Sequence, residues 1–409
     1  MHHTVGGVAR PFHVDCQDAV GRLRAALIGL YAAVGADPAR PQDVSRRFRL
    51  DKSLTWKISR ALHLDDPFAA AAVLPGASGI EILVDVMARH EAPAEIVAAV
   101  RRASEEYERV IDIHTGDRET LRLILDSMGR NGKALELSRR QAYRGSSGIW
   151  GVQCEVRVAA QCIAPNAANA DRLDLAFVGG WTDIRRLRPI PRWPILDVRH
   201  WRDDGTEADG AGARPPTPRY APLADPDGDD GGWILRDFCA GEMPEVFACQ
   251  HGDGIRFELG DGPIGRTGDF TCFTGYVSRD AASRYASEGD QYGQLRTGVS
   301  FPAASLLFDL FVHADLKEAL APEVQHFGRL PRDIVESDPS QVLPMAADVL
   351  QLGRNPSVAT PLVPRYDAMI DSAMAAAGWS RADFHLLRIV YAYPPVLSTI
   401  GLRFPLAQR

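Results

Sequence analysis

A short basic segment, residues 41–62, holds the side chains whose types and spacing suggest chemistry most clearly. Lys and Arg side chains bind phosphates or guanine edges, and Ser can hydrogen-bond to either. Between residues 46 and 60 there are six basic residues and one acid, Asp51. This composition predicts contacts to DNA. The candidate DNA-binding residues are Arg46, Arg47, Lys52, Ser53, Trp56, Lys57 and Arg60.

Two short helices joined by a tight turn would position these side chains. Pro41 suits the first residue of a helix, where a missing N–H costs nothing. The turn is expected at residues 49–51, with Asp51 or Ser53 capping the second helix. At about 100° per residue, one face of that helix is apolar and the opposite face is basic and polar. The apolar face consists of Leu50, Leu54, Ile58 and Leu62, and the polar face of Lys52, Ser53, Trp56 and Arg60, with Lys57 at the border.

The run DKSLTWKISRAL resembles the recognition-helix segment of IclR-type helix-turn-helix regulators, in which Lys-Ser-Thr-Val begins the second helix. Lys52 and Ser53 match that pattern, and Ile58 and Leu62 match its later apolar positions. Arg49 stands where the family often has Gly, and no Gly-turned hairpin follows to form a wing. The resemblance implies a double-stranded DNA partner. The competing interpretation is an amphipathic pair of core helices with a solvated basic face.

Composition and charge restrict the class of protein. The 409 residues predict two or three domains, and 45% hydrophobic content is ordinary for a globular protein. No run approaches eighteen apolar residues and the first twelve residues lack the apolar core of a signal peptide, so we expect a cytoplasmic protein with no membrane contact. Residues 1–145 carry a net charge of +2 and the remainder −9. A locally basic patch on an acidic body suits a DNA reader.

No cofactor or metal site is expected. The six cysteines are widely spaced without a CxxC pair, and Cys249 and His251 form a pair too small to indicate zinc. Residues 260–265 satisfy G-x-G-x-x-G formally, but Pro263 opposes the helix that a dinucleotide site needs, so a cluster of turns is expected. The alternating carboxylates at 225–230 lack the twelfth-position Glu of a calcium loop, since Arg236 stands there.

The pattern along the chain predicts an α+β protein. Helical periodicity dominates residues 1–145, the expected all-α, helix-turn-helix-containing domain. At Gly145 the period changes, and residues 151–162 alternate like a long half-buried strand. Residues 146–409 are therefore expected to form a mainly antiparallel β-rich domain with C-terminal helices and an acidic Gly/Pro-rich loop at 202–232.

The longest predicted helix, residues 93–114, carries an apolar stripe at heptad spacing. Its members are Ile96, Val100, Ala103, Tyr107 and Val110. Such a stripe can form the seam of a homodimer or face the core of its own domain. We favour the core, because two to three heptads are few for a coiled coil.

Catalytic motifs are weak in this sequence. The carboxylate pair Asp171 and Asp174, and Asp309 with His313, could meet in an active site. The basic cluster of Arg185, Arg186 and Arg188 is better explained as a solvated strand edge than as a phosphate site.

The most economical function is a DNA-binding transcriptional regulator whose β-rich domain senses a small molecule, binds a protein effector or holds a dimer. Two alternatives stay open. One is an enzyme with its active site in residues 146–409. The other is a structural or interaction protein in which Lys52, Trp56 and Lys57 are packed against the chain.

Overall fold

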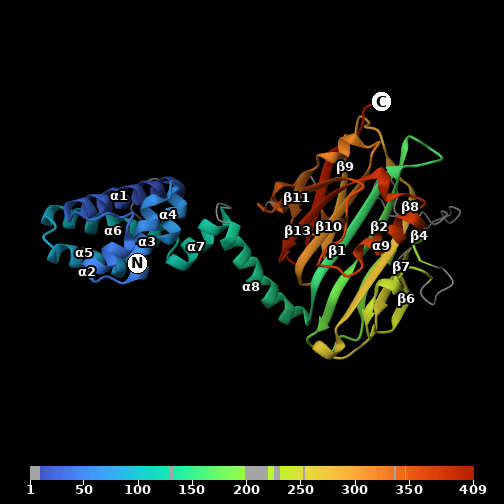
Figure 1. The fold of residues 1–409 in the computed structure, drawn as a ribbon, viewed down its shortest axis with the longest axis horizontal. Coiled ribbons are helices and arrows are strands. Elements are labelled where there is room, and N and C mark those ends of the chain that lie inside the picture. Colours follow the sequence, from blue (N-terminus) through green and yellow to red (C-terminus); the bar gives the residue numbers. More distant parts are fainter. Residues whose placement is uncertain are drawn as a thin grey trace, which may run out of the picture. The chain divides into compact units, whose positions relative to one another are not determined.

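The structure is a computed structural model that describes residues 10–128, 132–198, 220–224, 231–251, 254–335, 338–345 and 347–409. It contains two compact units, residues 1–135 (the helical unit) and residues 136–409 (the β-rich unit) (Figure 1). The chain is thus a mixed α+β protein, with a helical part followed by a β-rich part. The division falls between Leu135 and Glu136, inside a helix, and not at Gly145 where the sequence pattern changes.

The helical unit consists of short and medium helices around one core. In the described residues these are α1 Phe12–Ala33, α2 Pro41–Phe48, α3 Lys52–His63, α4 Pro67–Val73, α5 Ala77–Arg89, α6 Ala94–His114 and α7 Arg118–Ser127. Helix α1 lies along α6, and both supply residues that are fully buried, among them Leu23, Leu27 and Tyr107. The side chains that form the apolar faces of these helices therefore meet in a single cluster.

The heptad stripe of α6 faces this core. Val100 and Tyr107 are fully buried, and Ala103 and Val110 are less than one tenth exposed. The hydroxyl of Tyr107 donates to the carbonyl of Ala71 at 3.2 Å. The core assignment of the stripe is confirmed, so this stripe is not available as a dimer seam.

No single helix among the described residues is both long enough and apolar enough to cross a membrane. Helices α4 and α5 together pass on length and composition but are bent by 85° to each other. Both contribute to the core of the helical unit, for example through Phe68 and Leu83.

A large mixed sheet organises the β-rich unit. Helix α8, Gly132–Trp150, leads into it, and its strand order is β12-β13-β10-β1-β2-β8-β4, with β5 paired to β8. The central strands β1 and β10 run parallel, and the other pairings are antiparallel, as expected for most of this region. The strands are β1 Val152–Pro165, β2 Arg172–Arg186, β4 Tyr220–Pro222, β5 Ala240–Gly241, β8 Phe270–Ser283, β10 Ala303–His313, β12 Leu350–Arg354 and β13 Phe384–Ala392.

Smaller elements complete the β-rich unit. One three-stranded sheet contains β11 Glu323–Phe327, β14 Ser398–Pro405 and β9 Tyr292–Val299, and another contains β3 Trp193–Val198, β7 Gly254–Leu259 and β6 Val246–His251. Helix α9 spans Tyr366–Ala376. Single 3-10 turns lie at Arg236–Phe238, Arg266–Gly268, Lys317–Leu320, Pro331–Asp333, Pro339–Gln341 and Arg381–Asp383.

Both faces of the large sheet are covered. On one face, Val158 and Phe311 pack with Met369 and Ile370 of α9. On the other, Ala159 and Phe308 belong to a cluster with residues of β14. Strand β1 is therefore buried on both sides, and the expectation of a half-buried strand was wrong for its second half. The sequence alternates there because the small sheet accepts its polar side chains: Gln161 donates to the carbonyl of Arg296 at 2.8 Å.

Candidate nucleic-acid interface

The turn between α2 and α3 is built by local interactions. Arg49 ends α2 in the left-handed conformation, with φ 53° and ψ 38°. The hydroxyl of Ser45 donates to the carbonyl of Leu50 at 2.8 Å, and the N–H of Leu50 donates back to the carbonyl of Ser45 at 3.1 Å. A non-Gly residue in this conformation carries a cost of about 1 kcal/mol or more, and these two reciprocal bonds help to offset it.

Asp51 caps the N-terminus of α3. Its Oδ1 accepts from the N–H groups of Ser53 at 2.8 Å and Leu54 at 3.2 Å, so of the two caps that the sequence allowed, Asp51 and Ser53, it is Asp51 that caps the helix. Hydrogen bonds from Ser53 and from the N–H of Leu54 lower the pKa of the Asp51 carboxyl below its ordinary value. The helix therefore begins at a fixed residue, which sets the direction of every side chain after it.

The apolar side of α3 fixes the helix to the unit. Ile58 and Ala61 are fully buried, and Leu54 and Leu62 are each 8% exposed. At its C-terminal end, the guanidinium of Arg24 from α1 donates to the carbonyl of Leu62 at 3.0 Å. These contacts hold α3 against α1, α2 and α4.

The opposite side of α3 is open. Trp56 is 53% exposed, which is unusual for so large an apolar ring. The other exposed residues on this side are Lys52, Ser53, Lys57 and Arg60. These four residues and Trp56 form the α3 outer face. Lys52, Trp56 and Lys57 are therefore not packed against the rest of the chain, as the structural or interaction-protein alternative required.

Arg46 and Arg47 have different environments. Arg47 donates to the carbonyls of Gly35 at 2.7 Å and Val34 at 2.8 Å, and its guanidinium lies 4.8 Å from the ring centre of Phe48. It thus caps the C-terminus of α1, and the assignment of this exposed side chain as a phosphate contact stays a prediction. Arg46 is 74% exposed and lies 3.9 Å from a carboxylate oxygen of Asp43, a spacing that leaves its guanidinium accessible.

A groove of about 780 Å³ runs beside the α3 outer face, wholly within the helical unit. Its first wall is formed by Trp56, Lys57 and Arg60, and its floor by the end of α4 and the turn to α5, residues 72–76. Its far wall contains Arg118 and Arg122 of α7. The remaining lining residues are Ala39, Ser59 and His63.

Sequence reasoning missed the two arginines of α7. Arg118 forms an ion pair with Glu108 and lies 5.5 Å from the ring centre of Tyr107. Arg122 is exposed, and no carboxylate within the described residues lies within ion-pair distance of it. Their i, i+4 spacing places them on one helix face, which is the signal that was available. Only the fold brings that face to α3.

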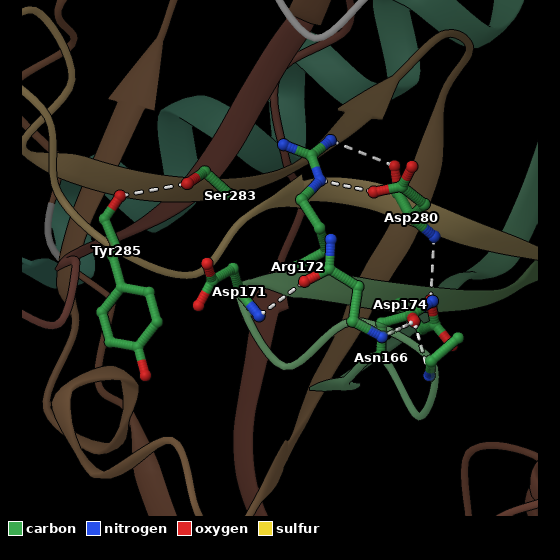
Figure 2. A network of polar contacts seen from close by, with 9 residues as sticks. Asn166, Asp171, Arg172, Asp174, Asp280, Ser283 and Tyr285 are labelled. Carbon is green, nitrogen blue, oxygen red and sulfur yellow. Dashed lines mark hydrogen bonds and ion pairs between the residues drawn. The ribbon is translucent and has the colours of Figure 1, made fainter. Parts of the chain in front are cut away.

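One alternative function requires an active site in the β-rich unit. Figure 2 shows a polar network around the ends of β2 and β8. The carboxylate of Asp174 is 3% exposed and accepts from Asn166 at 2.6 Å, from the N–H of Asp280 at 2.8 Å and from Arg279 at 2.8 Å. Arg172 forms an ion pair with Asp280 beside it (Figure 2). Both oxygens of Asp174 are thus engaged in joining strands.

In the described residues, the side-chain pairs considered for catalysis form no hydrogen bond or ion pair with each other. Asp171 pairs with Arg409 at 2.6 Å, whereas Asp174 pairs with Arg279 at 2.8 Å. Asp309 is fully buried in a bidentate pair with Arg388, and the Nδ1 of His313 lies 3.6 Å from Asp315 instead.

A cavity of about 730 Å³ does lie beside Asp174. It is lined by Ala164, Pro165, Asn166, Ala167, Ala168, Asp174, Arg279, His313, Asp315, Ala377, Gly378 and Trp379. The polar groups named above are already paired within the chain.

The basic cluster of Arg185, Arg186 and Arg188 also has partners within the chain. Arg185 pairs with Asp269, and Arg188 donates to the carbonyl of Trp150 at 3.3 Å. Arg186 is 3% exposed and donates to the carbonyl of Gly260, at the start of the glycine run, which forms a loop after β7. The expectation of a solvated strand edge was wrong for Arg186, which tertiary contacts bury, whereas Arg185 is half-buried and Arg188 is exposed.

In the described part of the chain, no group of three or more His, Cys, Asp or Glu side chains could hold a metal ion. Cys249 donates to the carbonyl of Arg256, and His251 contacts the Arg256 guanidinium at 2.8 Å. The acidic run at 225–230, like most of the 202–232 loop, lies outside the described residues.

No model of a known protein family matches this chain, and no curated protein sequence matches it. Its function therefore has to be argued from the geometry of the α3 outer face.

Proposed function

We propose that this protein binds double-stranded DNA as a transcriptional regulator, with α2 and α3 as a helix-turn-helix and α3 as the helix that enters the major groove. One observation carries the proposal. The exposed side of α3 holds three cations, Lys52, Lys57 and Arg60, and the helix contains no acidic residue. In the described residues none of these three cations has a carboxylate within 4 Å.

The dimensions of α3 suit this role. From Lys52 to Arg60 the helix rises about 12 Å, which equals the height of three to four base pairs. A helix in the major groove commonly contacts bases through its N-terminal residues, here Lys52 and Ser53. Trp56, Lys57 and Arg60 would then face the groove or its rim, and Arg46 at the end of α2 would contact a phosphate.

The rest of the helical unit supports such contacts. Arg47 and Arg24 tie α2 and α3 to α1 through backbone carbonyls, so the outer face is carried by a rigid frame. In this proposal the protein acts in the cytoplasm, and the β-rich unit senses a small molecule, binds a protein effector or holds a homodimer.

Fluorescence-anisotropy binding to mixed-sequence duplex DNA across a salt series tests the proposal. We expect salt-dependent binding that the triple variant Lys52→Ala/Lys57→Ala/Arg60→Ala loses. The slope of log K against log salt should fall by about 0.9 for each phosphate contact removed. No binding of the wild type at low salt would refute the proposal.

A matched control removes the same charge elsewhere on the helical unit. The variant Arg89→Ala/Arg102→Ala/Arg109→Ala changes three exposed arginines of α5 and α6. It should bind DNA nearly as the wild type does. Equal losses in both triple variants would mean that total charge, and not the α3 outer face, attracts the DNA.

A further inference from the structure

The groove beside the α3 outer face combines an apolar floor with cations on both walls. Ala72, Val73, Leu74 and Pro75 form the floor, where Leu74 and Pro75 are buried and the other two are half-buried. Lys57 and Arg60 stand on one wall, and Arg118 and Arg122 on the other. Among the described residues that line the groove, no side chain is acidic.

Because four cations and no acidic residue of the described chain line the groove, its electrostatic potential favours anions. A groove with low-dielectric walls and charges of one sign concentrates ions of the opposite sign. Arg118 is partly neutralised by Glu108, but Lys57, Arg60 and Arg122 have no such carboxylate in the described part of the chain. The groove therefore selects an anionic group.

The floor adds a second requirement. The volume of the groove, about 780 Å³, lies within the range of sites that bind small organic ligands. Such sites are mostly apolar and contain a few polar groups that orient the ligand. An inorganic anion would leave the floor and the ring of Trp56 exposed to water. An anion that carries an apolar chain would cover both.

We propose that this groove binds a small amphiphilic anion, a carboxylate or phosphate monoester on an apolar chain, as an effector that competes with DNA. The head group would lie between Arg60 and Arg122, and the chain would lie along residues 72–75 beside Trp56.

The competition follows from shared residues and rests on the proposed DNA-binding function. Trp56, Lys57 and Arg60 belong both to the groove and to the α3 outer face. A bound anion would neutralise two of the three cations of that face and cover its aromatic ring. Lys52 belongs to the outer face but does not line the groove, and Arg122 lines the groove but does not belong to the outer face. This difference allows binding of the anion and binding of DNA to be changed separately.

Isothermal titration calorimetry of the full chain with dodecanoate and with dodecyl phosphate, below their micelle concentrations and without DNA, tests the site directly. We expect saturable binding at one site for at least one head group, and no binding of acetate or of dodecyltrimethylammonium. The carboxylate and phosphate arms show which head group fits. Equal binding of the cationic amphiphile, or no binding of either anion, would overturn the proposal.

Two variants then separate the site from the DNA face. Arg122→Gln should weaken anion binding about fivefold, the size expected of one partly exposed charged contact, with DNA affinity unchanged. Lys52→Ala should weaken DNA binding and leave the anion affinity unchanged. Unaltered anion binding by Arg122→Gln would place the ligand elsewhere.

The regulatory step has its own readout. Saturating anion should raise the Kd for DNA at least tenfold, and an unchanged Kd would overturn the competition even if the anion binds. If the wild type does not bind DNA at all, the proposed function and the competition fail together. The calorimetric result still decides the anion site in that case.

Discussion

Arg46 and Arg47 are adjacent in sequence, yet the structure gives them opposite roles, and substituting each by Ala should separate stability from DNA binding. Arg47 donates two hydrogen bonds to the carbonyls at the end of α1, whereas Arg46 is exposed beside Asp43. Helix ends leave carbonyls without partners inside the helix, so removing Arg47 returns two of these groups to water.

The size of the effect follows from those two bonds. An intramolecular hydrogen bond contributes about 1 kcal/mol net, and less where water can replace it, so Arg47→Ala should destabilise the end of α1 by about 1–2 kcal/mol. An ion pair as exposed as that of Arg46 contributes about 0–1 kcal/mol, so Arg46→Ala should leave stability nearly unchanged.

Hydrogen exchange gives a local readout of this difference, because a chain with two compact units need not unfold in one step. Amides in the last turn of α1 should exchange about 5–30 times faster in Arg47→Ala than in the wild type. Arg46→Ala should show wild-type exchange but a salt slope of DNA binding lower by about 0.9. The same exchange rates and the same salt slopes in both variants would refute the assigned roles.

Two further predictions concern the β-rich unit. Asp309→Asn should destabilise it by about 3–5 kcal/mol in urea denaturation, because it leaves the buried Arg388 guanidinium without its carboxylate. The variant Asp309→Leu/Arg388→Met should recover most of the loss, and equal losses in both variants would contradict this. Burial, with a smaller effect of Arg139, lowers the pKa of His326 to about 4, so the unfolded chain takes up a proton near its ordinary pKa of 6.5 before the folded chain does. Stability should therefore fall by up to about 3 kcal/mol between pH 6.5 and pH 4, and His326→Gln should remove that part of the pH dependence. A pH profile unchanged in the variant would show that other groups are responsible.

Local sequence signals predicted the α2–α3 region well. Pro41 begins α2, residues 49–51 form the turn, and Asp51 caps α3. Each of these features depends only on residues that are close in sequence. The inward positions of Leu54, Ile58 and Leu62 follow from helical periodicity in the same way. Such features are encoded within one or two turns, so a single sequence contains them.

Features that depend on the fold were not predicted. Nothing near Arg47 shows that the end of α1 lies within its reach, and its charge alone suggested a phosphate contact. Arg122 is 62 positions after Arg60, and only the packing of α7 brings it to the groove. Arg157 and Gln161 looked like the solvent side of a strand, but β9 of a second sheet accepts them. Arg157 donates to the carbonyl of Gly298 at 3.4 Å, and Gln161 donates to the carbonyl of Arg296 at 2.8 Å.

The distribution of acids within the helical unit distinguishes a binding face from a merely solvated one. A helix surface that only has to remain in water carries charges of both signs, and α6 does so, with Arg101 held by Glu81 and Asp85 of α5. In the described residues, the cations of the α3 outer face have no carboxylate within 4 Å, and Asp51 attracts Lys57 only at longer range. Unpaired like charges a few residues apart repel each other and slightly destabilise the helix that carries them. In the proposed function, an anionic partner removes this repulsion when it binds.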